Sequence, residues 1–159
     1  MMKTYKYLII PVFIFLLLCG CGKEEEKNAL GEFVNFKVNV TVQDKELATP
    51  TNNKQFLKPR LAREGVGFSG LLVVCSAVPI TSSIYELYVY DLCCRHENKR
   101  EIRIVPEEDG MHAKCPSCGS TYNIINGVGN VVSGPAKNNL QKYRAVYSAS
   151  EPGLFIISN

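Results

Sequence analysis

Four side chains with metal-binding chemistry lie in two short stretches of the 159-residue chain. The first stretch reads Cys94-Arg95-His96 and the second reads Cys115-Pro116-Ser117-Cys118. Each stretch offers two ligands, and a set of thiolates with an imidazole suits zinc or an iron–sulfur cluster and suits calcium or magnesium poorly. We therefore expect the two stretches to be loops that hold one metal centre between them.

The residues between the two stretches predict a hairpin that positions these loops. Ile102 and Ile104 alternate with polar residues, residues 106–110 form an acidic turn that ends on a glycine, and residues 111–114 return the chain to Cys115. A hairpin of this kind brings its two ends together. Both candidate ligand loops are therefore expected at the same end of the fold.

The rest of the chain also predicts strands. Period-two alternation and short apolar runs indicate strands at residues 34–42, 71–75, 84–90, 122–125, 131–132, 140–147 and 154–157. Residues 44–64 are polar and predict a loop, with one short element near residues 55–57. Because no amphipathic helix and no internal repeat is evident, the expected fold class is all-β.

The N-terminal residues 1–20 have the pattern of an export signal. Lys3 and Lys6 precede an apolar run over residues 8–18, which is too short to span a bilayer comfortably. The residues Leu18-Cys19-Gly20-Cys21 resemble the lipobox of bacterial lipoproteins. This resemblance implies cleavage before Cys21 and diacylation of its sulfur, with residues 21–32 as a lipidated, charged tether. A plain secretory signal is the alternative.

The lipobox resemblance also implies a location. We expect the protein in the cell envelope, lipid-anchored to a bacterial membrane, in the outer membrane or at the surface rather than in the inner membrane. The formal net charge is +3, and two of those positive charges belong to the export signal, so no nucleic-acid partner is expected. The count of seven cysteines is odd, which argues against a pure disulfide framework.

Five separated motifs together resemble the Rieske [2Fe–2S] domain. In chain order they are Cys94-x-His96, the hairpin, Cys115-x-x-Cys118-Gly119-Ser120-x-Tyr122, Gly134-Pro135-Ala136 and Leu140-x-x-Tyr143. The resemblance covers roughly residues 70–157 of a domain over 33–159, with the cluster-binding part at about 92–136. It implies a Rieske-like antiparallel β-sandwich with two metal-binding loops at one end. The chain departs from the family pattern at Cys118, where the family has a histidine.

The resemblance also implies roles for individual residues. Cys94 and Cys115 would hold the buried iron, and His96 and Cys118 the outer one. The hydroxyls of Ser120 and Tyr122 would hydrogen-bond a bridging sulfide and a ligand thiolate, and residues 134–136 would cover the cluster. No nucleophile–base set, carboxylate pair or phosphate loop is evident. We therefore expect a membrane-anchored electron-transfer protein with redox protein partners, not an enzyme.

Two alternatives stay open at this point. In the first, the pairs Cys93-x-x-His96 and Cys115-x-x-Cys118 form two knuckles around a structural zinc ion. Ser120, Tyr122 and the Gly-Pro-Ala loop favour the cluster instead, because a zinc site has no need of them. In the second alternative the fold binds no metal and its cysteines form disulfides in an oxidising envelope.

Overall fold

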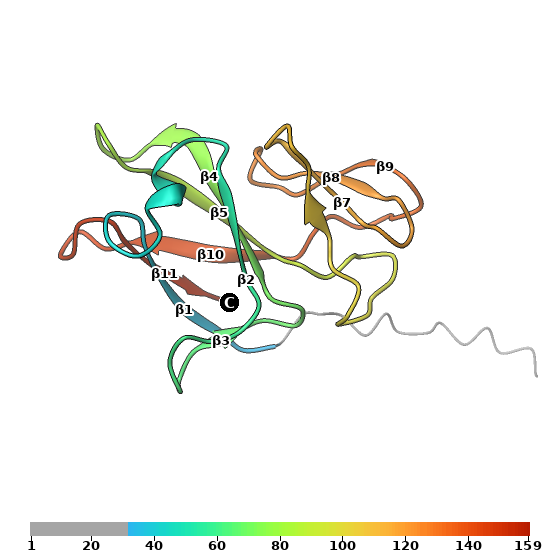
Figure 1. The fold of residues 1–159 in the computed structure, drawn as a ribbon, viewed down its shortest axis with the longest axis horizontal. Helices are drawn as coiled ribbons and strands as arrows, with labels where there is room; N and C mark the ends of the chain where they lie inside the picture. The colour runs from blue at the N-terminus through green and yellow to red at the C-terminus, as the bar shows by residue number, and fades with distance from the viewer. Residues whose placement is uncertain (1–31) are drawn as a thin grey trace, which may run out of the picture.

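The computed structural model describes residues 32–159, so the expected signal, Cys21 and nearly all of the expected tether lie outside the described residues. Within them the chain is almost entirely β-structure, with one short 3-10 helix, η1 (Lys45–Ala48). The strands form two antiparallel sheets (Figure 1). Their bounds are β1 Val34–Asn39, β2 Asn53–Phe56, β3 Gly65–Val66, β4 Leu71–Pro79, β5 Tyr85–Asp91, β6 Val105–Pro106, β7 His112–Lys114, β8 Thr121–Asn123, β9 Val131–Ser133, β10 Lys142–Tyr147 and β11 Leu154–Ser158.

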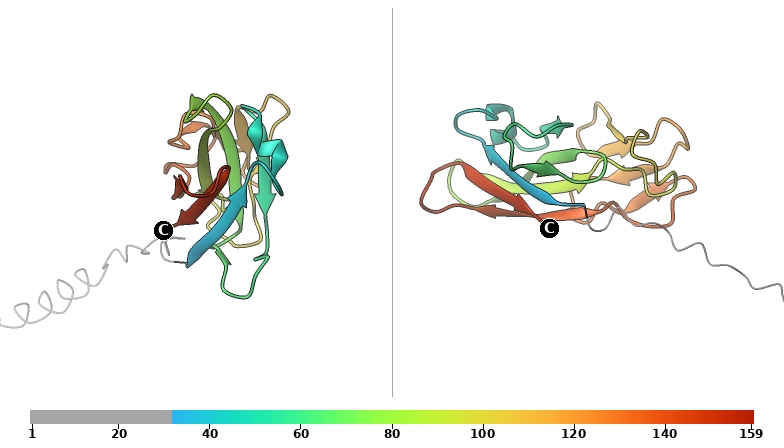
Figure 2. Two further views of the ribbon diagram at one scale, coloured as in Figure 1. Left: turned by 90° about the vertical axis from the view of Figure 1, so that its left-hand side faces the viewer. Right: turned by 90° about the horizontal axis from the view of Figure 1, so that it is seen from below.

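The larger sheet has seven strands in the order β2-β4-β5-β10-β11-β1-β3. It curls so far that strands near its two edges meet across a core: the ring of Phe36 in β1 lies 4.8 Å, centroid to centroid, from the ring of Phe56 in β2. Figure 2 shows this curled sheet from two further sides. The sheet is therefore nearly closed around a first hydrophobic core.

The smaller sheet has four strands in the order β6-β7-β8-β9, and it lies beside the larger one (Figure 1). A second hydrophobic core fills the space between them. Leu72 and Val74 of β4 belong to this core, together with Tyr122 of β8 and Ile124, which directly follows β8. Cys94 and Cys115 are buried in the same core.

Strand β4 contributes to both cores, which explains its sequence. Leu71, Val73 and Cys75 pack into the first core, whereas Leu72 and Val74 pack into the second. Successive side chains of a strand point to opposite faces, so a strand that is covered on both faces needs apolar residues at consecutive positions. The unbroken apolar run at residues 71–75 meets that need.

The all-β, antiparallel prediction is confirmed, with the two cysteine loops at one end of the molecule. Within residues 32–159 no helix has the length and apolarity to cross a membrane. Strand β2 and helix η1 occupy the segment that was expected to be mostly loop. The first strand of the expected hairpin, around Ile102, is not formed in full. In its place the chain has the two-residue strand β6 and one isolated β-bridge between Cys93 and Arg103.

The first strand is shorter than the alternation predicts, and Val42 is exposed rather than buried. The reason is a turn after β1. The side-chain carbonyl of Asn39 accepts hydrogen bonds from the amides of Thr41 (3.0 Å) and Val42 (3.0 Å). Asparagine stabilises such turns by bonding to the backbone two or three residues on. This local bond ends the strand before the apolar alternation does.

A buried carboxylate anchors the start of the first cysteine loop. Asp91 is fully buried at the end of β5 and accepts hydrogen bonds from the Tyr143 hydroxyl (2.8 Å) and from the amides of Phe68 (2.7 Å), Ser69 (3.1 Å) and Cys93 (2.8 Å). Buried charges need such partners. Burial, and then the negative charge of Asp91, raise the pKa of Tyr143, so its hydroxyl stays a donor. Asp91 therefore ties the loop to β10 and to residues 68–69.

Removing the phenol hydroxyl from this network should destabilise the fold. We predict that Tyr143→Phe lowers the free energy of unfolding by about 1.5–3 kcal/mol, the usual contribution of a hydrogen bond to a charged group. Urea unfolding monitored by circular dichroism measures this change. Tyr147→Phe on the same strand is the matched control and should cost less than about 1 kcal/mol. Equal losses for the two variants would contradict the role of Asp91.

Candidate metal centre

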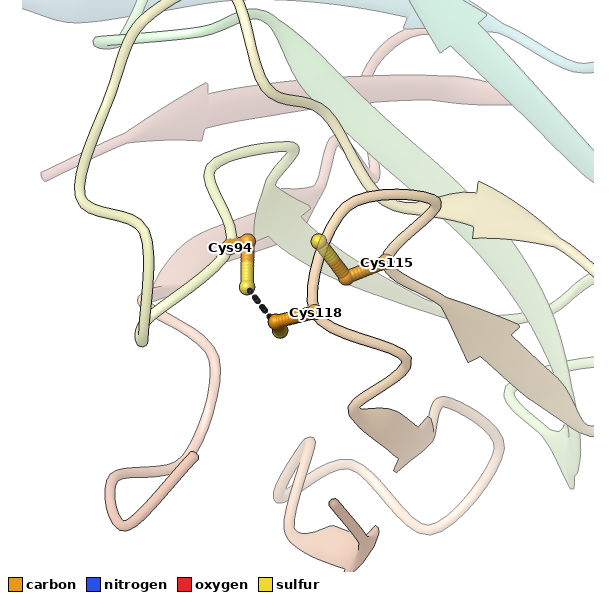
Figure 3. A group of neighbouring side chains, drawn as sticks. All are labelled: Cys94, Cys115 and Cys118. Carbon is orange, nitrogen blue, oxygen red and sulfur yellow. Dashed lines mark hydrogen bonds between the residues drawn. The ribbon is translucent and has the colours of Figure 1, made fainter. Parts of the chain in front are cut away.

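Three sulfur atoms converge between two loops (Figure 3). The Sγ atoms of Cys94, Cys115 and Cys118 all lie within 4.8 Å of one another, and those of Cys94 and Cys118 are 3.6 Å apart. Cys94 lies in the loop after β5, and the other two lie in the loop between β7 and β8. The structure thus brings together three of the four ligands that the sequence predicts.

The second loop is a tight turn with two cysteines on it. Its closure rests on two backbone hydrogen bonds, from the Cys115 amide to the Ser120 carbonyl (2.8 Å) and from the Gly119 amide to the Cys115 carbonyl (3.0 Å). Gly119 has a φ of +74°, in the left-handed region that glycine adopts without steric cost. The turn therefore holds Cys115 and Cys118 close together.

The two adjacent cysteines of the first loop have different surroundings. The Sγ atom of Cys93 lies 3.5 Å from the carbonyl oxygen of Cys94 and 3.8 Å from that of Lys99, and it is not part of the sulfur group. Burial raises the pKa of the Cys93 thiol to about 11. Consecutive side chains of extended chain point to opposite sides, so only one of the two can face the second loop. Cys94 is that residue, and the knuckle pair Cys93-x-x-His96 is not assembled with Cys115 and Cys118 here.

His96 lies two residues after Cys94 and is exposed. Its ring nitrogens are not part of the group formed by the three sulfur atoms. Its assignment as the fourth ligand stays a prediction.

Two hydroxyl groups contact the sulfur atoms. The Tyr122 hydroxyl lies 3.5 Å from Cys94 Sγ and accepts a hydrogen bond from the Arg95 amide (3.2 Å). The Ser120 hydroxyl lies 3.1 Å from Cys118 Sγ and accepts a hydrogen bond from the Ala136 amide (3.0 Å). Each cysteine loop thus has a hydroxyl against one of its thiols.

The Gly-Pro-Ala segment packs directly against the second loop. Gly134 has a φ of +93°. A Cβ atom added at this position would lie only 2.5 Å from the Cα atom of Ser120 and would clash with it. The close approach therefore requires glycine. It allows the Ala136 amide to reach Ser120, which fixes the hydroxyl beside Cys118.

The thiols of the second loop differ in acidity. Burial raises the pKa of Cys115 to about 12. Burial also acts to raise the pKa of Cys118, but its hydrogen bonds with the Ser120 hydroxyl and amide and with the neighbouring thiols outweigh this effect and lower the pKa below its ordinary value. Of the three cysteines in the sulfur group, Cys118 is the one that is not fully buried. Chemistry with external reagents should therefore begin at Cys118.

A hydrogen bond that the sequence did not indicate joins the two loops. The Ser117 hydroxyl donates to the Glu97 carboxylate at 2.8 Å. Neither residue belongs to the predicted site, and no spacing rule relates positions 20 residues apart on different loops. The bond links the loops on the exposed side of the sulfur atoms.

A second group of metal-binding residue types lies at the turn between β6 and β7. It consists of Glu107, Asp109 and His112, whose ligand atoms lie within 4.8 Å of one another. Asp109 accepts hydrogen bonds from the amides of Met111 (2.8 Å) and His112 (3.0 Å), and it pairs with the His112 ring (2.6 Å). Asp109 stabilises the turn through these bonds, which accounts for the close approach of its side chain to His112 without a metal ion.

Comparisons with known proteins find similarity among solved structures. No protein-family model and no curated protein matches the chain. Among solved structures, the chain is similar to the ferredoxin of carbazole 1,9a-dioxygenase from Nocardioides aromaticivorans IC177, with 15% sequence identity and a TM-score of 0.45. The match covers 77% of this chain and 96% of the ferredoxin. The function proposed below rests on the geometry of the site.

The contact between Ser120 and Cys118 can be tested on the reduced, metal-free chain. Because the hydroxyl lowers the pKa of Cys118, we predict that Ser120→Ala slows alkylation of this thiol by iodoacetamide several-fold near neutral pH. Mass spectrometry of the modified peptide measures the rate. Ser82→Ala, which removes an exposed hydroxyl from the turn between β4 and β5, is the control and should leave the rate near that of the wild type. An unchanged rate in Ser120→Ala would contradict the prediction.

Proposed function

We propose that this chain is an electron-transfer protein that carries a Rieske-like [2Fe–2S] cluster, with Cys94, Cys115 and Cys118 as ligands and His96 as the fourth. The observation that carries the proposal is the convergence of three thiols from two loops, with hydroxyl groups against two of them. Sulfur and imidazole donors are those that iron–sulfur centres use.

The donor set present in the described residues fits three of the four ligand positions of such a cluster. When bound, the cluster supplies a site that gains and loses one electron at a time. The chain's own residues exclude water from Cys94 and Cys115, which are fully buried, and direct the hydroxyls of Ser120 and Tyr122 at the sulfur atoms. The same arrangement would hold a metal centre rigidly, because both loops are bonded to the sheets behind them.

The kinds of ligand determine the reduction potential that we expect for the cluster. Centres with two histidines have potentials of about −150 to +300 mV, and four-cysteine clusters of the plant type lie near about −400 mV. Cys118 in place of a histidine adds one negative charge to the centre. We therefore propose a potential between these two ranges, with a weaker pH dependence than a two-histidine centre shows.

The remaining parts of the proposal come from the sequence. Lipidation at Cys21 would anchor the protein to a bacterial membrane in the cell envelope, where the domain would exchange electrons with redox protein partners. We propose no enzymatic reaction and no nucleic-acid partner. Metabolic labelling with palmitate, compared between the wild type and Cys21→Ala, tests the anchor; label in both would contradict it.

Metal analysis tests the cluster itself. We predict that the full-length chain, purified in detergent without oxygen, contains two irons and two acid-labile sulfides per chain, as a [2Fe–2S] centre requires. Cys118→Ala should lose both. Cys93→Ala is the matched control, because it removes a neighbouring buried thiol outside the sulfur group, and it should keep them. One zinc ion without iron or sulfide would contradict the cluster and favour the structural zinc site.

The Tyr122 hydroxyl should tune the potential. A hydrogen bond to a ligand thiolate stabilises the reduced, more negative centre. We predict that Tyr122→Phe lowers the midpoint potential by tens of millivolts, where about 59 mV corresponds to a tenfold change in a one-electron equilibrium. Protein-film voltammetry measures the shift, and Tyr88→Phe serves as a control outside the sulfur group. An unchanged midpoint in Tyr122→Phe would remove this hydroxyl from the surroundings of the centre.

A further inference from the structure

We infer that in the metal-free chain Cys94 and Cys118 form a disulfide that joins the two loops, while Cys93 and Cys115 remain thiols. The Sγ atoms of Cys94 and Cys118 are already in contact at 3.6 Å (Figure 3). A disulfide bond is about 2.05 Å long, so the two sulfur atoms need to approach by about 1.5 Å. The inference uses the thiols of the proposed cluster but does not depend on the cluster being formed.

The pairing follows from the position of each thiol. Cys93 is adjacent to Cys94 in the sequence, but its sulfur contacts the carbonyls of Cys94 and Lys99 and lies outside the sulfur group. Cys115 lies within 4.8 Å of the pair and is fully buried. Cys75 is buried in the first core, away from both loops. Cys94 and Cys118 are therefore the favoured pair, because their sulfur atoms are in contact at 3.6 Å and Cys118 is the thiol that an external reagent reaches first.

The loops are held so that this closure does not require them to unfold. On the outer side, the Ser117 hydroxyl bonds to Glu97 and links the loops. On the inner side, Tyr122 in β8 accepts a hydrogen bond from the amide of Arg95, the residue after Cys94. The first of these bonds is exposed and the second is partly buried. They keep the thiols facing each other when no metal is present.

The oxidation proceeds by two exchange steps with an external low-molecular-weight disulfide. The Cys118 thiolate, the least buried of the three, attacks one sulfur of that disulfide, forming a mixed disulfide and releasing one thiol. The Cys94 thiolate then attacks the Cys118 sulfur and releases the second thiol. The two protein thiols lose two electrons and two protons, and the external disulfide gains them as two thiols.

The disulfide would act as a closed state of the site. Two of the three thiols are consumed by it, and a metal centre needs both as thiolates. An oxidised chain therefore cannot take up a metal until a reductant restores the thiols. When the site holds no metal, interconversion of the two thiols and the disulfide would therefore transfer two electrons.

Disulfide mapping tests the inference on the full-length chain. The chain is reduced, stripped of metal with a chelator without oxygen, and exposed to oxidised glutathione; free thiols are then alkylated and the chain is digested with trypsin. Cleavage after Arg63, Arg95, Lys114 and Lys137 leaves Cys75, Cys93 and Cys94 in one peptide and Cys115 and Cys118 in another. We expect a crosslink between these two peptides.

Single serine variants then identify the pair. The crosslink should be lost in Cys94→Ser and in Cys118→Ser, and it should form at the wild-type rate in Cys93→Ser and Cys115→Ser. A wild-type crosslink rate in Cys94→Ser, a disulfide confined to the Cys115–Cys118 peptide, or no disulfide at all would overturn the inference. Circular dichroism of each variant confirms that it is folded before the comparison is made.

The result is separable from the test of the cluster. A chain that forms the Cys94–Cys118 crosslink but holds no iron and sulfide would refute the proposed cluster and leave the disulfide standing. A chain that holds the cluster but keeps all its thiols free when emptied and oxidised would refute the disulfide alone.

Discussion

The two halves of the molecule are joined through β4, a strand buried on both faces. Its alternate side chains enter different cores, and each buried Val or Leu stabilises the fold by about 1.5–3 kcal/mol relative to an exposed position. The apolar outer face of β4 contributes Leu72 and Val74 to the second core. Since Cys94 and Cys115 are part of that core, the geometry of the sulfur group depends on the packing of the smaller sheet against β4. The site is thus a product of the fold's main packing interface rather than of two free loops.

The position of the first loop depends further on Asp91. This carboxylate gathers donors from residues 68–69, from Cys93 and from Tyr143, so four separate backbone or side-chain groups fix the point where the chain leaves β5. A buried carboxylate is costly when it lacks such partners. Here these hydrogen bonds offset the free-energy cost of burying the Asp91 carboxylate, and they also fix the direction in which the chain leaves β5. The amide of Cys93 is bonded to Asp91, and Cys94 is the next residue along the extended chain, on the opposite side.

Sequence patterns predicted much of this structure, and the gaps have physical causes. The main strands could be located because a strand buried on one face alternates apolar and polar residues, and a strand buried on both faces is a continuous apolar run. The turn after β1 was missed because a single Asn39 side chain ends the strand while the alternation continues to Val42. The role of Asp91 was missed because an acidic residue at a strand end has no pattern that distinguishes a buried network from a solvated surface. The family resemblance favoured Cys94 and the zinc alternative favoured Cys93, and only the structure gives the direction of each side chain.

The sulfur group has an inner and an outer side, and this asymmetry relates its two proposed chemistries. Cys94 and Cys115 are fully buried, Cys118 is partly exposed, and His96 is exposed. A reagent, a metal ion or a partner protein can therefore reach Cys118 and His96 before it reaches the buried thiols of Cys94 and Cys115. A bound centre would exchange electrons through this side, and an empty site would react with disulfides from the same side. Because Cys118 takes part in both, the metal-bound and disulfide states exclude each other, and the occupant of the site decides whether it carries one electron or two.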